Sequence, residues 1–446
     1  MWESIENFGV IGWLLLFVIL YFLARLFEQA WLFRRQSFYK EAIEWVVLEI
    51  KIPREVEKTP RSMEQFFMNL HGLMNAPNDF MEKYFDGEVT LWWSMEIASF
   101  GGEVHLYIRT PKKHKKVTEA ALYAQYQSVE IYEVEDYMDS FPRETREVYK
   151  KGYNIFGSEI ILRKDDFYPI MSYENFELDK NEMALDPISA LIEVLANIHK
   201  EEIVFLQFLI RPTGTEWQEA GKKIVEELTL KKKEKNKKSG FGGGFHEWFK
   251  NFFWAPIEHP SWLGEKEIKE EKFEFGMFKL TPGETDTIKA IEKSLSKQGF
   301  DSLIRYLYYS PNSIFSTNFA RRGLLGALNQ YASQNLNSFR SNYSVETRTK
   351  WIYYPYVFVK QRVEAKKQRV LYNYQNRKFP EKLAFGKFFT SHIFNFNNKS
   401  KNFILNTAEI ATLFHIPAET VLTAPHIKRA ESKKMGPPAG LPIFKE

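Results

Sequence analysis

Apolar and polar positions alternate most clearly near residue 50, and the period then changes. Val46, Leu48 and Ile50 are separated by single residues, which is typical of a strand with one buried face. Thr59 followed by Pro60 forms an N-cap with a first-turn proline, and the apolar residues after it recur at helical spacing. The pattern therefore predicts a strand followed by an amphipathic helix.

Two further alternating runs, 89–97 and 104–108, flank the pair Gly101 and Gly102, which predicts a β-hairpin. Small apolar residues then predict a helix near 117–124, and a last strand is expected at 129–137. The order β-α-β-β-α-β is that of the ferredoxin-like plait, in which both helices cover one face of a four-stranded antiparallel sheet. We expect this domain at residues 45–140.

A second α+β unit is predicted after the turn-rich stretch 164–186. A helix beginning near Pro187 precedes an apolar strand at 203–210, interrupted only by Gln207, and another helix opens near Glu216. A strand at 273–280, a helix after Pro282, a strand at 302–309 and a helix at 314–332 follow. We therefore assign 141–230 as the start of this unit and 271–425 as its remainder.

The N-terminal residues 8–24 contain no charged or strongly polar group. Seventeen residues of helix span roughly 26 Å, about the thickness of a bilayer core, and aromatic residues flank the run. This predicts a transmembrane anchor with a juxtamembrane helix at 1–44. Representative anchor residues are Phe8, Trp13, Leu16, Ile19, Tyr21 and Leu23.

A cleaved signal peptide is the alternative for this run, but it requires a basic start and small residues at a cleavage site. Here Glu3 and Glu6 precede the run, and bulky residues follow it. Arg25, Arg34 and Arg35 follow the run, which places the C-terminal bulk in the cytoplasm. We expect a single-pass protein of the cytoplasmic (inner) membrane with its N-terminus outside.

Residues 231–270 are predicted to form a basic, glycine-rich linker that ends in a short aromatic helix at 245–254. Lysines beside an aromatic helix are typical of a membrane-surface segment, and a plug that docks on its own domain is the alternative. The proline-rich residues 426–446 are expected to be an extended tail.

Composition limits the chemistry. The 446 residues carry a net charge of +4 and include no cysteine, which excludes disulfides, thiolate metal sites and cysteine nucleophiles. The nine histidines show no metal-ligand spacing, and neither a P-loop nor a G-x-S-x-G motif occurs. We therefore expect no cofactor, no metal and no enzymatic activity.

Residues 360–387 hold nine Lys and Arg against two Glu, with tyrosines and phenylalanines between them. Such a segment is typical of single-strand nucleic-acid binding, and a basic helix face opposite a buried aromatic stripe is the alternative. The candidate contacts to a nucleic acid or an acidic partner are Lys360, Arg362, Lys366, Lys367, Arg369, Arg377 and Lys378.

Two passages carry a resemblance to a known family: VLEIKIPREVEKTPRSMEQFF with WWSMEIASFGGEVHLYIRTP, and FILNTAEIATLFHIP with SKKMGPPAGLP. They resemble poorly characterised bacterial membrane proteins associated with conjugation and type IV secretion. These proteins are similar to the non-motor N-terminal region of FtsK/HerA-type ATPases of conjugative DNA transfer. The chain ends where the motor of those ATPases begins.

The resemblance implies a membrane-anchored scaffold or adaptor that works with a separately encoded motor ATPase. The matching positions that it marks as a motor-docking segment are Asn406, Thr407, Glu409, Phe414, His415 and Pro417, with Ala411 and Thr412 between them. Pro437, Pro438, Leu441 and Pro442 match the linker into the motor. The bilayer and the motor are the expected partners, and DNA and a second copy of the chain are left open.

Overall fold

The computed structural model describes residues 2–52, 59–77, 79–176, 186–230, 281–348, 357–381, 386–387, 394 and 398–417. Its strands all pair antiparallel in one sheet. They are β1 (Trp45–Lys51), β2 (Trp93–Phe100), β3 (Glu103–Pro111), β4 (Glu130–Val134), β5 (Tyr153–Leu162), β6 (Ile203–Pro212), β7 (Gly299–Pro311), β8 (Phe339–Ser341) and β9 (Phe403–Asn406).

The strand order is β4-β1-β3-β2-β6-β7-β5-β8, with β9 paired to β7. The first four strands therefore lie in the order fourth, first, third, second, and β5 to β8 repeat this order in reverse. The halves meet where β2 pairs with β6 along eight residue pairs, from Trp93 opposite Ile210 to Phe100 opposite Ile203. One continuous sheet thus contains both halves of the chain.

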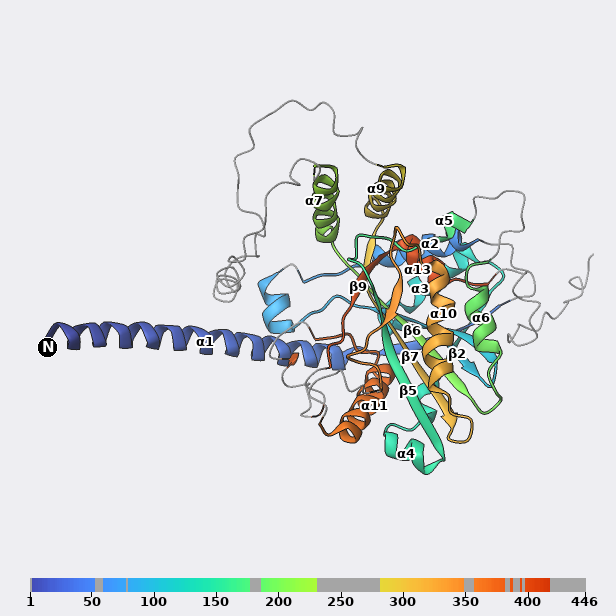
Figure 1. Ribbon diagram of the computed structural model, residues 1–446, viewed down its shortest axis with the longest axis horizontal. Helices are drawn as coiled ribbons and strands as arrows, with labels where there is room; N and C mark the ends of the chain where they lie inside the picture. The colour runs from blue at the N-terminus through green and yellow to red at the C-terminus, as the bar shows by residue number, and fades with distance from the viewer. Residues whose placement is uncertain are drawn as a thin grey trace, which may run out of the picture.

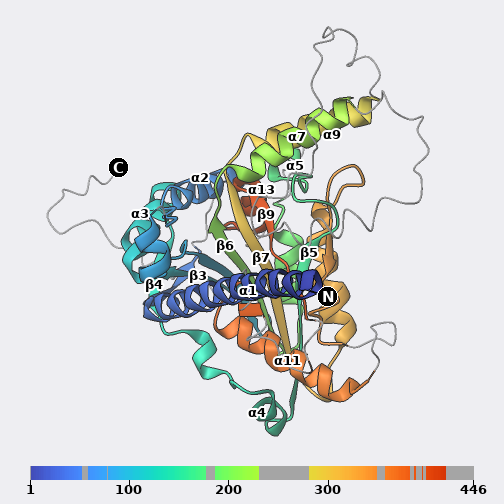
Figure 2. The ribbon, with the colours of Figure 1, turned by 90° about the vertical axis from the view of Figure 1, so that its left-hand side faces the viewer.

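Helices cover both faces of the sheet (Figures 1 and 2). The first face carries α2 (Pro60–His71), α3 (Lys115–Gln125), α6 (Ser189–Ala196), α10 (Leu324–Leu328) and α13 (Thr407–Leu413). The second face carries α4 (Thr145–Lys150) and α11 (Val359–Gln375). The helices α7 (Glu216–Leu230) and α9 (Pro282–Leu295), which follow β6 and precede β7 in the chain, pack against each other. α5 (Tyr173–Phe176) contacts α13.

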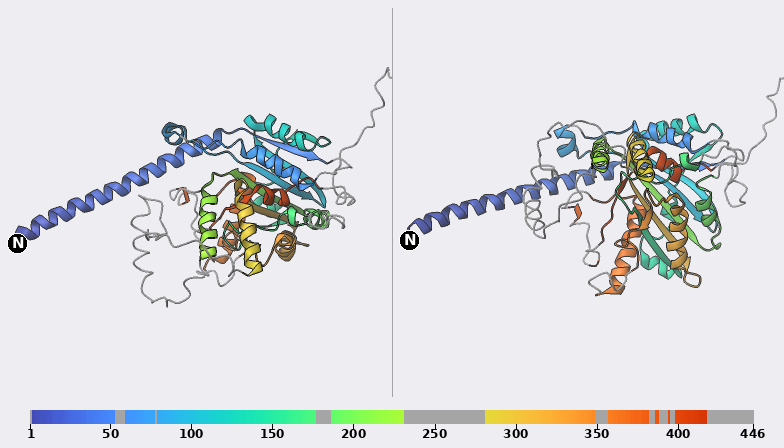
Figure 3. Two further views of the ribbon diagram at one scale, coloured as in Figure 1. Left: turned by 90° about the horizontal axis from the view of Figure 1, so that it is seen from above. Right: turned by 45° about the horizontal axis from the view of Figure 1, so that its top comes forward.

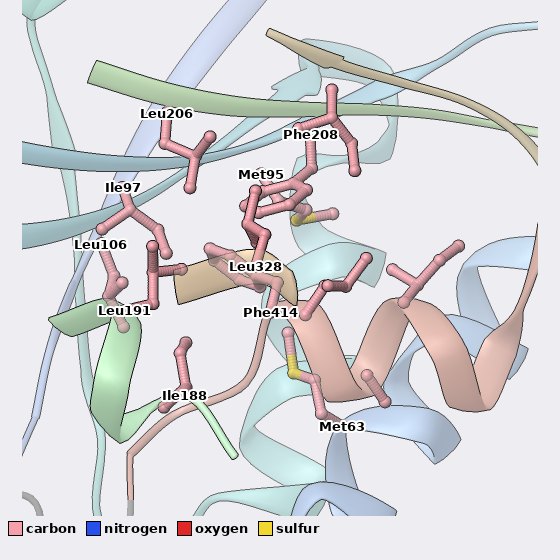
Figure 4. Packing of buried hydrophobic residues seen from close by; sticks show 14 of the residues in the cluster. Met63, Met95, Ile97, Leu106, Ile188, Leu191, Leu206, Phe208, Leu328 and Phe414 are labelled. Carbon is pink, nitrogen blue, oxygen red and sulfur yellow. The ribbon is translucent and has the colours of Figure 1, made fainter. Parts of the chain in front are cut away.

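The main core lies under the first face and draws residues from both halves of the sheet (Figure 4). Met95 of β2 and Phe208 of β6 pack there with Met63 of α2 and Leu328 of α10, and all four are almost completely buried. Since burying such a side chain stabilises the fold by about 1.5–3 kcal/mol, this shared core joins the two halves energetically.

One helix stands apart from this body. α1 (Trp2–Ala42) is 41 residues long, and its N-terminal part projects beyond the sheet (Figures 1 and 3), with residues 12–24 exposed. An apolar window of 18 residues within Gly12–Ala42 has a mean hydropathy of 1.7 and no buried residue. Length and apolar composition make it the candidate membrane span among the described residues.

The expected α+β class, the antiparallel sheet and the apolar N-terminal helix are confirmed. The first half matches the predicted element order, although β2 begins at Trp93 and not at Val89. The second unit differs, because it begins with β5 and not after residue 186. The stretch expected as one helix at 314–332 consists of a π-helix (Phe319–Gly323), α10 and a 3₁₀ turn (Asn329–Tyr331).

Several predictions lie outside the described residues. They concern the linker and aromatic helix at 231–270, the strand at 273–280 and the tail at 426–446.

A buried polar row as the candidate functional site

A row of polar side chains crosses the second face of the sheet, one residue from each of seven adjacent strands. Each member lies opposite the next in the strand pairing. In order across the sheet, the row is Tyr132, Glu49, Tyr107, Glu96, Gln207, Arg305 and Glu159. From Glu96 to Glu159 the four side chains are at most 1% exposed. A buried charged group is stable only when it is paired and hydrogen-bonded. The partners of these four side chains therefore show which parts of the chain the row connects.

Glu96 lies at the centre of the row and is paired with Arg377, which follows the end of α11. The guanidinium donates to both carboxylate oxygens, from Nε at 2.9 Å and from Nη2 at 3.0 Å. Tyr137 and Gln207 donate to the same carboxylate at 2.6 and 3.0 Å. Burial alone would raise the pKa of Glu96, but the charge and hydrogen bonds of Arg377 outweigh it and lower the pKa to about 2.

Arg377 also holds a second carboxylate, that of Asp136 just before the short helix Tyr137–Ser140. Its Nη1 and Nη2 donate to the two oxygens of Asp136 at 2.5 and 2.8 Å. The backbone of Arg377 has a φ of 47°, in the left-handed region that non-glycine residues seldom adopt. The guanidinium thus connects β2, the 136–140 turn and the C-terminal end of α11.

Arg305 makes the second ion pair of the row, with Glu159 of β5 at 3.1 Å. Its Nη1 also donates to Gln207 Oε1 and to the carbonyl of Asn373, and its Nη2 donates to the carbonyl of Lys378. Ser400 adds a hydrogen bond to Glu159 at 2.6 Å. The two arginines therefore fasten both ends of the 373–378 turn to the sheet. The ion pairs and hydrogen bonds of the row therefore have a structural role, which is to join the end of α11 and the turn after it to the sheet.

The seven basic candidates do not share one exposed face. Lys360 and Lys378 are exposed, whereas Lys367 and Arg369 are half-buried. Arg362, Lys366 and Arg377 are buried. Lys367 contacts the hydroxyl of Tyr149 at 3.3 Å and Asn154 at 2.6 Å, and burial lowers its pKa. The basic pattern therefore mainly reflects the packing of α11 on the sheet.

The residues marked as a motor-docking segment are also internal. Asn406 and Glu409 form a reciprocal capping box at the start of α13, and the hydroxyl of Thr407 donates to Glu64 at 3.0 Å. His415 Nε2 lies 2.6 Å from Asp186, and Phe414 and Pro417 are buried. The structure gives these side chains a place in the core beside α2, and their part in docking stays a prediction.

The anchor candidates lie together on the projecting part of α1. Trp13, Leu16, Ile19, Tyr21 and Leu23 are between 41% and 64% exposed. Phe8 belongs to the same helix.

A pocket of about 410 Å³ opens between α9 and the 334–335 loop. Its charged lining residues are already engaged, because Lys164 donates to two backbone carbonyls and Glu284 forms a capping box with Thr281. Within the described ranges, no group of three or more His, Asp and Glu is placed to hold a metal ion.

The prediction from sequence missed the polar row itself. A signal was present, because single polar residues interrupt apolar strand runs at Glu96, Gln207 and Arg305. Their alignment across the sheet depends on strand order and register, which the local pattern does not contain.

The fold and this row define a mixed α/β protein built on one antiparallel sheet, with an apolar helix at the N-terminal end of the described residues. A family model described as a domain of unknown function (DUF8128) matches residues 34–429, so the chain belongs to that family. A comparison with curated proteins finds no match.

Proposed function

We propose that the protein is a membrane-anchored, non-enzymatic scaffold or adaptor of a conjugation or type IV secretion-like machine. It works with a separately encoded FtsK/HerA-type ATPase. α1 would cross the cytoplasmic membrane once, with the sheet on the cytoplasmic side. The observation that carries this proposal is the contrast within α1. Residues 12–24 of its apolar run are exposed, whereas its later part contacts residues 82–86 of the body. Moving the exposed apolar side chains of the 18-residue apolar window from water into the hydrocarbon core of a bilayer is strongly favourable in free energy.

We further propose that the body consists of two ferredoxin-like units. Each half has a helix after its first strand and after its third strand, and the strand orders mirror each other across the β2–β6 pair. Such units present broad surfaces, which suits an adaptor. The resemblance of the 403–417 passage to the region ahead of conjugative motors supports the choice of partner.

The test is affinity purification of the full chain from host membranes in mild detergent, followed by identification of retained proteins. We expect a P-loop ATPase to be retained. The matched control carries Leu16→Lys and Leu20→Lys, two exposed positions whose substitution leaves the sheet unchanged. Charges at the centre of the span oppose insertion. Alkaline carbonate should therefore extract this control variant from the membranes, whereas the parent chain should stay in the membrane pellet. Recovery of intact complexes without any ATPase would count against the adaptor role.

A further inference from the structure

Residues 79–88 expose more large apolar side chains than a short surface segment needs. Phe80, Met81 and Phe85 are 62%, 53% and 46% exposed. The π-helix η1 (Glu82–Asp86) lies in this segment, which is packed along α1 on the side from which the apolar half of α1 projects (Figure 3). Clustered exposed apolar residues of this kind mark interaction sites.

Hydrogen bonds and a close backbone approach join the segment to α1. Trp31 Nε1 donates to the carbonyl of Tyr84 at 2.6 Å, and the hydroxyl of Tyr39 donates to Glu88 at 3.1 Å. Gly87 has a φ of 68°, and a Cβ there would lie 2.4 Å from the backbone of Arg35. These contacts place the backbone that carries the apolar side chains directly beside α1.

The order of these contacts gives the direction of the segment. Tyr84 bonds to Glu28, and Glu88 bonds to Tyr39. The segment therefore runs alongside α1 away from the apolar run. Its beginning, with Phe80 and Met81, points toward that run.

The position also fits the depth of a membrane interface. The apolar run ends at residue 24, and Trp31 lies about 10 Å further along the helix axis. The headgroup layer extends roughly 5–8 Å beyond the hydrocarbon core on each side, so Trp31 lies at its outer edge, and the beginning of the 79–88 segment, nearer the apolar run, lies within it. The ring of Phe85 lies 6.5 Å from that of Trp31, and the ring of Phe80 lies 6.2 Å from that of Phe85.

We propose that residues 79–88 form a second membrane contact, in which Phe80, Met81 and Phe85 enter the interfacial layer beside the point where α1 leaves the bilayer. This inference rests on the proposed span of α1. The segment carries four acidic residues and one lysine, so apolar burial and not attraction to anionic lipid drives the contact. Two points of contact fix the orientation of the sheet toward the membrane.

The test uses the absence of native cysteines. A single cysteine replaces Met81, is labelled with an environment-sensitive fluorophore, and the full chain is reconstituted in neutral phosphatidylcholine vesicles. Lipids with a nitroxide near the headgroup or deep in the acyl chain report the depth. Val117→Cys on α3 is the matched control, because Val117 is 45% exposed and α3 lies far from the apolar half of α1. Leu20→Cys reports the span.

We expect the Met81 label to be several-fold brighter than the Val117 label and to be quenched most by the shallow nitroxide, without added anionic lipid. A Met81 label as dim as the Val117 label, with the Leu20 label quenched by the deep nitroxide, overturns the second contact and leaves the anchor. A bright Met81 label that neither nitroxide quenches also overturns it, because protein then covers the segment. A Leu20 label that the deep nitroxide does not quench contradicts the span and, with it, the second contact as proposed.

Discussion

Arg377 combines two properties that are each unusual for an arginine, complete burial and a positive φ. Both are maintained by its partners, since Glu96 and Asp136 together receive four hydrogen bonds from one guanidinium. A buried pair of this kind adds little net stability over an apolar pair, but removing one partner leaves an isolated buried charge.

Arg377→Met should therefore lower the free energy of unfolding by about 3–5 kcal/mol, because the carboxylate of Glu96 loses its counter-charge in the interior. Urea denaturation of the purified full chain in mild detergent measures this. Lys378→Met is the matched control, since Lys378 is the exposed neighbour, and the change there should stay within about 0.5 kcal/mol. Equal effects of the two substitutions would argue against a structural role for the ion pairs of Arg377 with Glu96 and Asp136.

Glu409 shows how strongly burial changes the pKa of a carboxyl group. Burial raises its pKa from 4.5 to about 7, although the backbone amides of Asn406 and Ile170 donate to it and oppose the shift. The folded state thus binds a proton between pH 4.5 and 7 that the unfolded state releases, so the contribution of Glu409 to stability is complete below about pH 4.5 and is lost as the pH rises through 7.

The variant Glu409→Gln should remove this dependence. Comparing the free energies of unfolding at pH 5 and pH 8, we expect the loss with rising pH to be smaller by about 3 kcal/mol in the variant than in the parent chain. Equal pH slopes in the two proteins would show that Glu409 titrates normally.

At the scale of elements, sequence periodicity predicts most of the first half, because each element there has a clean pattern and a clear boundary signal. Thr59 and Pro60 begin α2, and Gly101 and Gly102 turn the hairpin as expected. β5 escaped prediction because Gly157, Ser158 and Glu159 interrupt its apolar run. All three are explained only by tertiary contacts, with Glu159 paired to Arg305 on a strand more than 140 positions away.

The same limit applies to α11. Its basic residues suggest a surface helix when they are considered along the sequence, but the structure places Val370, Leu371 and Tyr374 against the sheet and uses the cations near them as internal partners. Which face of a basic helix is buried depends on the surface it meets, and the local sequence does not contain that surface.

Gly157 makes the close approach of α11 possible. A Cβ at this position would lie 2.7 Å from a methyl of Leu307 and 2.8 Å from a methyl of Val370. Gly157→Ala should therefore destabilise the fold by about 1–3 kcal/mol through overpacking. Gly326→Ala is the control, because a Cβ there meets nothing within 4 Å and alanine favours the helix by up to about 1 kcal/mol. The thermal unfolding temperature should fall for Gly157→Ala and rise for Gly326→Ala. An unchanged unfolding temperature for Gly157→Ala would show that α11 can shift to accommodate the added methyl group at little cost.

At the scale of the whole molecule, the boundary expected near residue 140 is not a gap between separate cores. β2 and β6 pair across it, and the cluster under the first face contains Leu106 from the first half and Leu206 from the second. Separate domains require few contacts between them, whereas here the seam is an eight-pair strand ladder in the middle of the sheet.

The body should accordingly unfold as one cooperative unit. Hydrogen exchange measured with increasing urea should give β1 and β3 of the first half the same opening free energy and the same denaturant dependence as β5 and β7 of the second half. Phe205→Ala removes a fully buried ring from β6 at the seam and should lower both values together by about 3–5 kcal/mol. Val117→Ala, on the exposed face of α3, serves as the control and should leave both unchanged within about 0.5 kcal/mol. If one half opened at lower urea than the other, the ladder between β2 and β6 would join two domains that fold independently, and the shared core would contribute less than its burial indicates.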